Sequence, residues 1–200
     1  MNTYREKMKI WLDSNRPFSA AEVRAAGIPS QILVELHNQG AIERLARGIY
    51  LSTSAQPTEN LSLQTVSLKV PDGVICLLSA LLFHNFTTQL PNEVWLAVKQ
   101  HAWIPRLASP VLRIITMSGT PFEFGVEEHD IDGVKVKVYS AAKTVADCFK
   151  FRNKIGLDVA MEALREGLRL KRFNVSELMS AAKVCRVSKV ITPYVESVLE

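Results

Sequence analysis

Residues 19–51, SAAEVRAAGIPSQILVELHNQGAIERLARGIYL, decide the fold of the N-terminal part of this 200-residue chain. Ser19 and Glu22 have the spacing of a capping box, in which a hydroxyl and a carboxylate each accept a hydrogen bond from a free backbone N–H at a helix start. Gly27 follows a few residues later and suits a turn with positive φ. An apolar helical face comes next and ends at Gly40. The pattern predicts two helices joined by a tight turn, which is a helix-turn-helix.

A β-hairpin is predicted directly after the second helix. Residues 42–45 and 49–51 are short β-prone runs, and the turn between them contains Gly48. A helix-turn-helix followed by such a hairpin is a winged helix, in which the second helix enters the major groove of DNA and the hairpin contacts the flanking backbone. Upstream, apolar side chains within residues 4–12 share one helical face, so a further helix is expected before Pro17.

The phase of the second helix indicates which of its side chains would face DNA. We place Leu33 and Leu36 on the core side, because they continue the apolar face. The outward side chains are then Ser30, Gln31, Val34 and Asn38. Gln and Asn can bind adenine through two hydrogen bonds, and Val can contact the thymine methyl group. The candidate phosphate contacts are Arg24, Arg44 and Arg47. This helix contains Glu35 and no Lys or Arg, so a winged helix that binds another protein instead of DNA stays open as the alternative.

A second domain is expected after a connection rich in Ser, Thr and Pro at residues 52–60. We set the winged helix-turn-helix DNA-binding domain at 1–54, a linker with a short helix at 55–72, and the second domain at 73–200. The apolar run 74–83 predicts a buried helix rather than a strand. Strand-like runs follow at 93–98, 111–116, 122–127 and 134–139.

The last of these runs alternates Val with Lys, which gives it one buried and one charged face, and Asp132-Gly133 before it is a hairpin-turn pattern. From Ser140 onward the periodicity is helical. We therefore expect an α+β fold: an N-terminal winged helix-turn-helix, then a mixed sheet over residues 93–139, and a C-terminal helical bundle over residues 140–200.

Composition and charge exclude several classes of protein. Hydrophobic residues make up 48% and charged residues 22%, which is typical of a folded globular protein and not of a disordered one. The net charge of +4 permits nucleic-acid binding without requiring it. No apolar run approaches the roughly 20 residues of a membrane helix. Residues 1–9 mix charged and polar side chains, unlike a signal peptide, so we expect a cytoplasmic protein with no membrane partner.

No sequence pattern predicts a catalytic or metal site. Cys76, Cys148 and Cys185 are far apart and lack CxxC spacing, so each is expected to be a small buried hydrophobic residue. The four histidines form no HxH, HxxxH or HExxH spacing, and the motifs GxxxxGK[ST], GxGxxG and GxSxG are absent. We predict a protein that needs no cofactor or metal and is not an enzyme. A nuclease with scattered carboxylates is the enzymatic alternative.

A stripe of charged residues is the remaining distinctive feature. Lys143, Asp147, Lys150 and Lys154 recur at helical spacing opposite an apolar face, so they are expected to be exposed. The basic residues that lie close to this stripe in sequence are Lys135, Lys137 and Arg152. Two interpretations stay open: an ordinary solvated helix face, or a docking surface for RNA, DNA or an acidic protein.

Two stretches together resemble the AbiEi family, the antitoxins of type IV toxin–antitoxin systems linked to abortive phage infection. Arg44-Leu-Ala-Arg47-Gly48-Ile-Tyr50 is similar to the wing of that family. Residues 140–156, SAAKTVADCFKFRNKIG, resemble its C-terminal motif. The order and spacing of the two stretches match the family over nearly the whole chain.

The resemblance implies two activities. The winged helix would bind inverted repeats in the double-stranded promoter DNA of its own operon and repress it. The domain over 73–200 would be an antitoxin domain that counters a cognate nucleotidyltransferase toxin, without the need for a stable complex. Lys143, Thr144, Asp147, Lys150 and Arg152 match the family motif and become candidates for that role. The expected antitoxin surface comprises Lys135, Lys137, Lys143, Thr144, Asp147, Lys150, Arg152 and Lys154.

Overall fold

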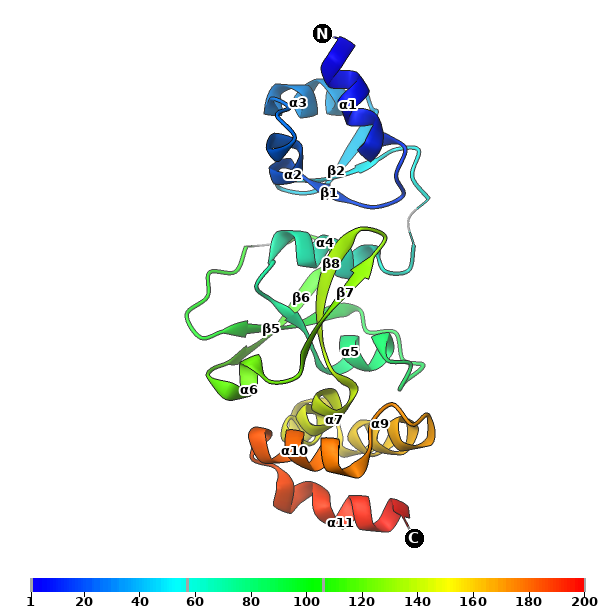
Figure 1. Cartoon of the computed structure of the whole chain (residues 1–200), viewed down its shortest axis with the longest axis vertical. Coiled ribbons are helices and arrows are strands. Elements are labelled where there is room, and N and C mark those ends of the chain that lie inside the picture. The colour runs from blue at the N-terminus through cyan, green and yellow to red at the C-terminus, as the bar shows by residue number, and fades with distance from the viewer. Residues whose placement is uncertain (1, 57, 106, 200) are drawn as a thin grey trace. The chain divides into compact units, whose positions relative to one another are not determined.

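The computed structural model describes residues 2–56, 58–105 and 107–199 (Figure 1). The chain divides into two compact units. The first unit extends to Asp72 and also includes Trp103–Val111 and His129–Val136. The second unit comprises Gly73–Ala102, Leu112–Glu128 and the residues from Lys137 onward. Each unit is therefore assembled from more than one stretch of sequence.

The first unit begins with three helices and a small antiparallel sheet. The helices are α1 (Asn2–Leu12), α2 (Ala20–Ala25) and α3 (Ser30–Asn38). The strands are β1 (Phe18–Ser19), β2 (Ile42–Ala46) and β3 (Ile49–Ser52), in the order β1-β3-β2. The helices and the β2–β3 hairpin occur in the order of a winged helix-turn-helix, as predicted. Strand β1, only two residues long, was not predicted.

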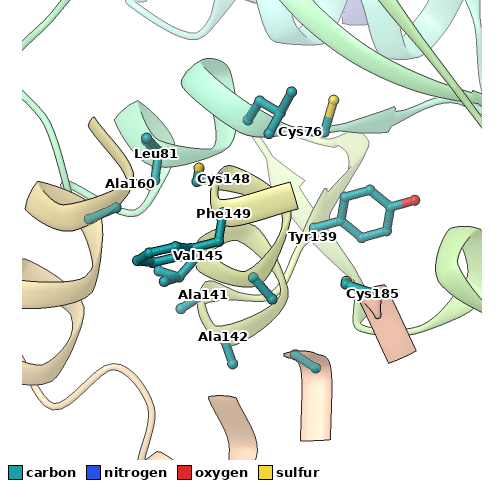
Figure 2. Packing of buried hydrophobic residues seen from close by; sticks show 14 of the residues in the cluster. Cys76, Leu81, Tyr139, Ala141, Ala142, Val145, Cys148, Phe149, Ala160 and Cys185 are labelled. Atoms are coloured by element: carbon teal, nitrogen blue, oxygen red, sulfur yellow. The ribbon is translucent and has the colours of Figure 1, made fainter. Parts of the chain in front are cut away.

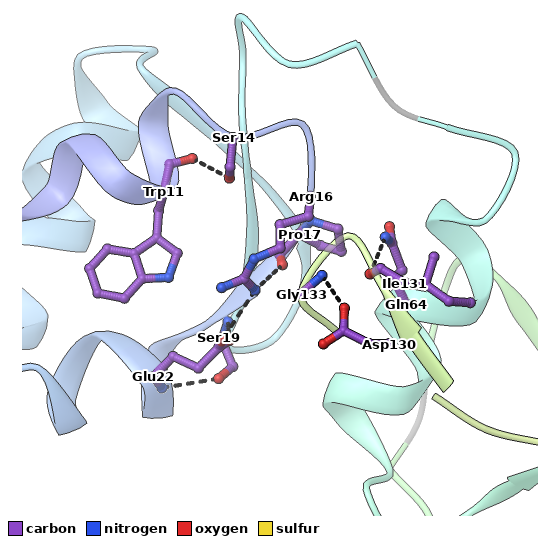
Figure 3. Close-up of polar contacts among 10 residues, drawn as sticks. All are labelled: Trp11, Ser14, Arg16, Pro17, Ser19, Glu22, Gln64, Asp130, Ile131 and Gly133. Carbon is purple, nitrogen blue, oxygen red and sulfur yellow. Dashed lines mark hydrogen bonds and ion pairs between the residues drawn. The ribbon is translucent and has the colours of Figure 1, made fainter. Parts of the chain in front are cut away.

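The starts of α2 and α3 differ in how they are capped. Ser19 Oγ accepts a hydrogen bond from the backbone N–H of Glu22 at 3.1 Å, and Glu22 Oε2 accepts one from the Ser19 N–H at 2.6 Å (Figure 3). The capping box predicted for α2 is therefore present. Helix α3 instead begins after Pro29, and its first residue, Ser30, gives no side-chain cap. Proline needs no N–H partner, so it is a suitable residue at this boundary.

A hydrophobic core holds α1, α2 and α3 against the sheet. The buried side chains of this cluster are Met8, Trp11, Phe18, Val23, Ile28, Ile32, Leu33, Leu36 and Ile42. The ring centroids of Trp11 and Phe18 are 6.1 Å apart. The predicted inward phase of α3 is confirmed, since Leu33 and Leu36 are 2% and 5% exposed.

Helix α4 (Leu61–Lys69), in the expected linker, packs against β1 and β3. Its Gln64 is fully buried, and the amide Nε2 donates to the carbonyl oxygen of Ile131 at 3.1 Å (Figure 3). The same Nε2 also donates to Asp132 Oδ2 at 3.2 Å. Lys69 Nζ donates to the carbonyl oxygen of Arg47 at 2.5 Å. This helix is therefore an integral part of the first unit and not a free connection.

A mixed five-stranded sheet has the order β6-β5-β4-β8-β7. Its strands are β4 (Val74–Ile75), β5 (Glu93–Lys99), β6 (Val111–Met117), β7 (Val126–Ile131) and β8 (Val134–Tyr139). Central strand β4 is antiparallel to β5, with Ile75 opposite Leu96, and parallel to β8, with Ile75 opposite Val138. The β7–β8 turn has positive φ at Asp132 and Gly133, 51° and 81°, as the hairpin pattern predicts.

Two sequence predictions in this region are wrong. Residues 74–83 were expected to form one buried helix, but they form β4 and then α5 (Leu77–Phe83). Residues 122–127 were expected to form a strand, but α6 (Thr120–Glu123) occupies the first part and β7 starts only at Val126. A short apolar run does not distinguish a buried strand from a buried helix by periodicity, and Pro121 at the start of α6 favours a helical turn.

Five helices follow the sheet: α7 (Ala141–Lys150), α8 (Arg152–Ile155), α9 (Leu157–Arg169), α10 (Val175–Cys185) and α11 (Ser188–Leu199). Helix α7 is central, because α5, α9, α10 and α11 all pack against it (Figures 1 and 2). Every residue of α7 from Ala141 to Phe149 is buried. The predicted C-terminal helical bundle is therefore confirmed, with α7 as its core. Across the described parts of the chain, no helix has the length and apolar character to cross a membrane.

Candidate nucleic-acid interface

The outer face of α3 carries the four side chains that the helical phase predicts. Ser30, Gln31, Val34 and Asn38 are all exposed, and Val34 is 50% exposed. Glu35, the acidic residue of this helix, is half-buried. The exposed face therefore offers amide and hydroxyl groups around one apolar side chain, which is a set of groups able to contact base edges in a major groove.

Three arginines of the same unit are also exposed. Arg24 lies in α2, Arg44 in β2, and Arg47 in the turn between β2 and β3. Arg44 Nε donates to the carbonyl oxygen of Ala46 at 3.4 Å, beside an irregularity in the β2–β3 register. The guanidinium groups are able to bind phosphate oxygens with two parallel hydrogen bonds. All seven predicted DNA-binding residues are thus accessible within one unit.

Lys69 contacts the hairpin turn, and the sequence does not predict this contact. Its Nζ donates to the Arg47 carbonyl oxygen, while Gly48 in the same turn has a φ of 81°. The contact joins residues 22 positions apart, so no local pattern indicates it. It positions the backbone of Arg47 through the carbonyl group, so the exposed guanidinium group stays available to bind phosphate.

Arg16, also missed, orders the start of the helix-turn-helix. Its Nη1 donates to Glu22 Oε1 at 2.9 Å and to the carbonyl oxygen of Pro17 at 3.1 Å (Figure 3). Glu22 therefore serves the capping box with one carboxylate oxygen and Arg16 with the other. These bonds fix the entry of α2, which precedes the exposed helix α3.

The predicted basic stripe in the second unit is only partly on the surface. Lys143, Thr144 and Asp147 are each 0% exposed, so their expected place on an antitoxin surface is wrong. The physical reason is the central position of α7, which is covered on all sides. The other residues of the set stay accessible: Lys135, Lys150 and Lys154 are exposed, and Lys137 and Arg152 are half-buried. Arg152 Nη1 donates to the carbonyl oxygen of Phe149 at 2.9 Å.

The buried residues form a polar cluster inside the hydrophobic core. Lys143 Nζ forms an ion pair with Asp147 Oδ2 and lies 4.0 Å from the centroid of the Tyr139 ring. Cys185 Sγ donates to Asp147 Oδ1 at 3.2 Å. Thr144 Oγ1 donates to the carbonyl oxygen of Tyr139 at 3.1 Å. Figure 2 shows Tyr139 and Cys185 beside α7. Each charged group of the pair is thus compensated, as burial requires.

Burial controls the protonation of this cluster. It raises the pKa of the Asp147 carboxyl above its usual value, and the charge of Lys143 and its hydrogen bond offset only part of this rise. Burial also raises the pKa of the Cys185 thiol to about 12, and it raises the pKa of Cys76 and Cys148 well above 9.0. A thiol held in its neutral form is a poor nucleophile and metal ligand. Among the described residues, no group of three His, Cys, Asp or Glu side chains has the geometry to hold a metal ion.

The first unit has a helix-turn-helix, then a hairpin, and the α3 face is exposed. This order of elements is that of the winged-helix class. Residues 6–53 match the family model described as transcriptional regulator, AbiEi antitoxin, and so confirm the resemblance over this segment. That family model describes transcriptional regulators that are antitoxins.

Most of the chain is similar in fold to a solved structure. The crystal structure of the RV2827C protein from Mycobacterium tuberculosis superimposes with a TM-score of 0.63 over 92% of this chain and 73% of that chain. Sequence identity is 10%, so the likeness concerns the fold alone. No curated protein matches the sequence of the chain.

Proposed function

We propose that the protein is a transcriptional autorepressor that binds inverted repeats in the double-stranded DNA of its own promoter. The observation that carries the proposal is the exposed α3 face with its three neighbouring arginines, within the segment that matches the AbiEi family. Gln31 and Asn38 read base edges, and Val34 contacts a thymine methyl group. Arg44 and Arg47 bind the flanking phosphates from the hairpin, and Arg24 does so from α2.

A titration of promoter DNA at several salt concentrations tests this proposal. Arg47→Ala removes a phosphate contact but keeps the carbonyl oxygen that accepts from Lys69. We expect weaker binding to every sequence and a decrease of about 1 in the slope of log K against log salt. Arg165→Ala is the matched control, since this exposed arginine of α9 carries the same charge outside the first unit.

Two outcomes would contradict the proposal. If Arg47→Ala and Arg165→Ala lower affinity equally, net charge and not the hairpin determines binding. If the wild-type protein shows no salt-dependent association with its promoter, the first unit is a protein-interaction module instead. The lack of Lys and Arg on α3, with Val34 half-exposed, is the feature that would favour that second function.

We propose further that the second unit counters a cognate nucleotidyltransferase toxin through its accessible basic residues. The argument rests on the family match and on the exposure of Lys150 and Lys154, with Arg152 half-buried between them. Because neutralisation needs no stable complex, growth of cells that express the toxin is the proper measurement. We expect Lys154→Ala to reduce rescue while Lys189→Ala, an exposed lysine of α11, preserves it. Equal rescue by both would remove this surface from the mechanism.

A further inference from the structure

A cavity of about 500 Å³ opens in the second unit between the end of β6, the start of α6, and the ends of α7 and α10. The side chains that matter for its chemistry are Ser118, Thr120, Lys150, Phe151 and Arg186, and Gly119 forms part of its wall. The volume lies within the range of small-molecule sites. The cavity is separate from the predicted DNA-binding face, which lies wholly in the first unit.

The cavity is positively charged. Lys150 and Arg186 both line it and are both exposed, and no residue of its described lining is acidic. Among the described residues neither cation has an ion-pair partner. The acidic residue of α6, Glu123, already pairs with Lys99 at 3.4 Å. Two cations beside the hydroxyl groups of Ser118 and Thr120 are a set of donors suited to a phosphate group.

The backbone at Arg186 has a conformation that favours glycine. Arg186 follows α10 with φ 60° and ψ 40°, and the bonds Arg186 N–H to Lys183 carbonyl (3.1 Å) and Val187 N–H to Ala182 carbonyl (2.8 Å) close a Schellman-type turn. A side chain other than glycine in this left-handed conformation costs free energy. An arginine at this position is therefore expected to be less stable than glycine would be, which makes the site testable by substitution.

A buried contact joins the two helix ends that carry the cations. Cys185 precedes Arg186, and its Sγ donates to Asp147 on α7. Lys150 is one helical turn beyond Asp147 on the same helix. The bond between Cys185 and Asp147 thus joins the C-terminal ends of α7 and α10, from which the two cations extend. The backbone positions from which the two side chains extend are therefore held before a ligand binds.

An aromatic ring completes the lining. Two lysines approach the Phe151 ring, and the Nζ atoms of Lys150 and Lys154 are 5.8 Å and 5.6 Å from its centroid. Aromatic side chains beside cations are typical of sites that stack a base and bind the attached phosphates.

We propose that this cavity binds a nucleotide. Lys150, Arg186 and the hydroxyl groups of Ser118 and Thr120 bind its phosphates, and Phe151 stacks on its base. The site does not depend on DNA binding by the first unit. The test of nucleotide binding and the test of DNA binding can therefore give opposite results.

Calorimetric titration of the full chain with the four ribonucleoside triphosphates, the matching nucleosides and inorganic phosphate tests the proposal. We expect at least one triphosphate to bind more tightly than its nucleoside and than inorganic phosphate. Arg186→Gly should weaken this binding about tenfold or more, because a charged donor to phosphate is lost. The same change should raise Tm by about 2–4 °C, because glycine relieves the left-handed backbone. A variant that is more stable yet binds less cannot be explained by misfolding.

Lys171→Gly is the matched control. Lys171 follows α9 with φ 52°, is exposed, and carries the same charge, but it does not line the cavity. We expect a similar rise in Tm with nucleotide affinity unchanged. Three results would overturn the proposal: no binding of any triphosphate at millimolar concentration, equal affinity for a nucleoside and its triphosphate, or unchanged affinity in Arg186→Gly. Inorganic phosphate that binds as tightly as the triphosphate would also overturn it, because Phe151 would then contribute nothing.

Discussion

At the scale of single residues, Lys143 and Asp147 show how a charged pair comes to lie at the centre of a hydrophobic cluster. Their spacing of four residues allows direct pairing within one helix turn, and the Tyr139 ring and the Cys185 thiol contact the remaining sides. Charge periodicity predicts an exposed stripe, because isolated charges are almost never buried. The sequence does not show which charges find partners, so this part of the candidate site could not be predicted.

Removal of one partner should destabilise the second unit strongly. We expect Lys143→Met to lower the free energy of unfolding by about 3–5 kcal/mol, because Asp147 then stays buried without a counter-charge. The double variant Lys143→Met/Asp147→Leu should recover most of that loss. Urea denaturation followed by circular dichroism measures both. Lys154→Met is the control on exposed surface and should change stability by less than about 0.5 kcal/mol. A single variant as stable as the wild type would show that the pair contributes little.

The buried thiols predict a loss of stability at alkaline pH. Burial raises the pKa of Cys185 from 9.0 to about 12 and also raises the pKa values of Cys76, Cys148 and Tyr139. Above pH 9 the unfolded chain releases protons that the folded chain retains, so unfolding becomes more favourable as pH rises. Each thiol adds up to about 1.4 kcal/mol per pH unit to this decline.

Urea denaturation between pH 8 and the alkaline limit of reversibility measures that slope. Cys148→Ala should flatten it by one titrating group, even though the truncation lowers stability at neutral pH. An identical slope in the variant and the wild type would mean that the Cys148 thiol does not titrate with unfolding.

At the scale of helices and strands, sequence patterns predicted the elements that are set by neighbouring residues, such as caps and turns. They missed the elements that form only through contacts with residues far away in the sequence. The capping box at Ser19 and the Asp132-Gly133 turn both lie where expected. Strand β4 is only two residues long and exists because β5 and β8 flank it. The α3 face was predicted correctly because a single amphipathic period decides it, whereas the Lys69 contact to the hairpin needed the fold itself.

The two helix starts of the winged helix provide a paired test. Ser19→Ala removes the side-chain acceptor of the α2 capping box and should lower the free energy of unfolding by about 1 kcal/mol. Ser30→Ala at the first residue of α3 removes a hydroxyl that caps nothing and should change it by less than about 0.5 kcal/mol. Thermal unfolding of both variants and the wild type measures the two losses of stability. Equal losses would indicate that the Ser19 hydroxyl has no special role.

At the scale of the whole molecule, the first unit is not a single stretch of sequence. Residues 129–136 belong to it, and two of them, Ile131 and Asp132, accept the hydrogen bonds of the buried Gln64 amide. Sequence composition places the domain boundary from the linker alone, because Ser, Thr and Pro mark a connection. Composition does not indicate that residues 129–136, from the β7–β8 hairpin, also belong to this unit.

A fragment of residues 1–72 should therefore be less stable than the same unit in the intact chain. Excision leaves the Gln64 amide without its two acceptors, which costs about 1–3 kcal/mol. Trp11 is the one tryptophan of the fragment, and its fluorescence reports unfolding. Replacement of Trp95 and Trp103 by Phe makes Trp11 the reporter in the intact chain as well. Equal midpoints for fragment and intact chain would show that residues 129–136 do not support the unit.

Because part of the β7–β8 hairpin belongs to the first unit, recombination between genes is constrained. A domain encoded by one uninterrupted stretch moves to a new gene by a single crossover at its end. Here a crossover near residue 72 would transfer α1 to α4 without Ile131 and Asp132. Chimeras that exchange the proposed DNA-binding surface between homologues should therefore graft the exposed α3 residues alone, because a single crossover between residues 72 and 136 would divide both folded units.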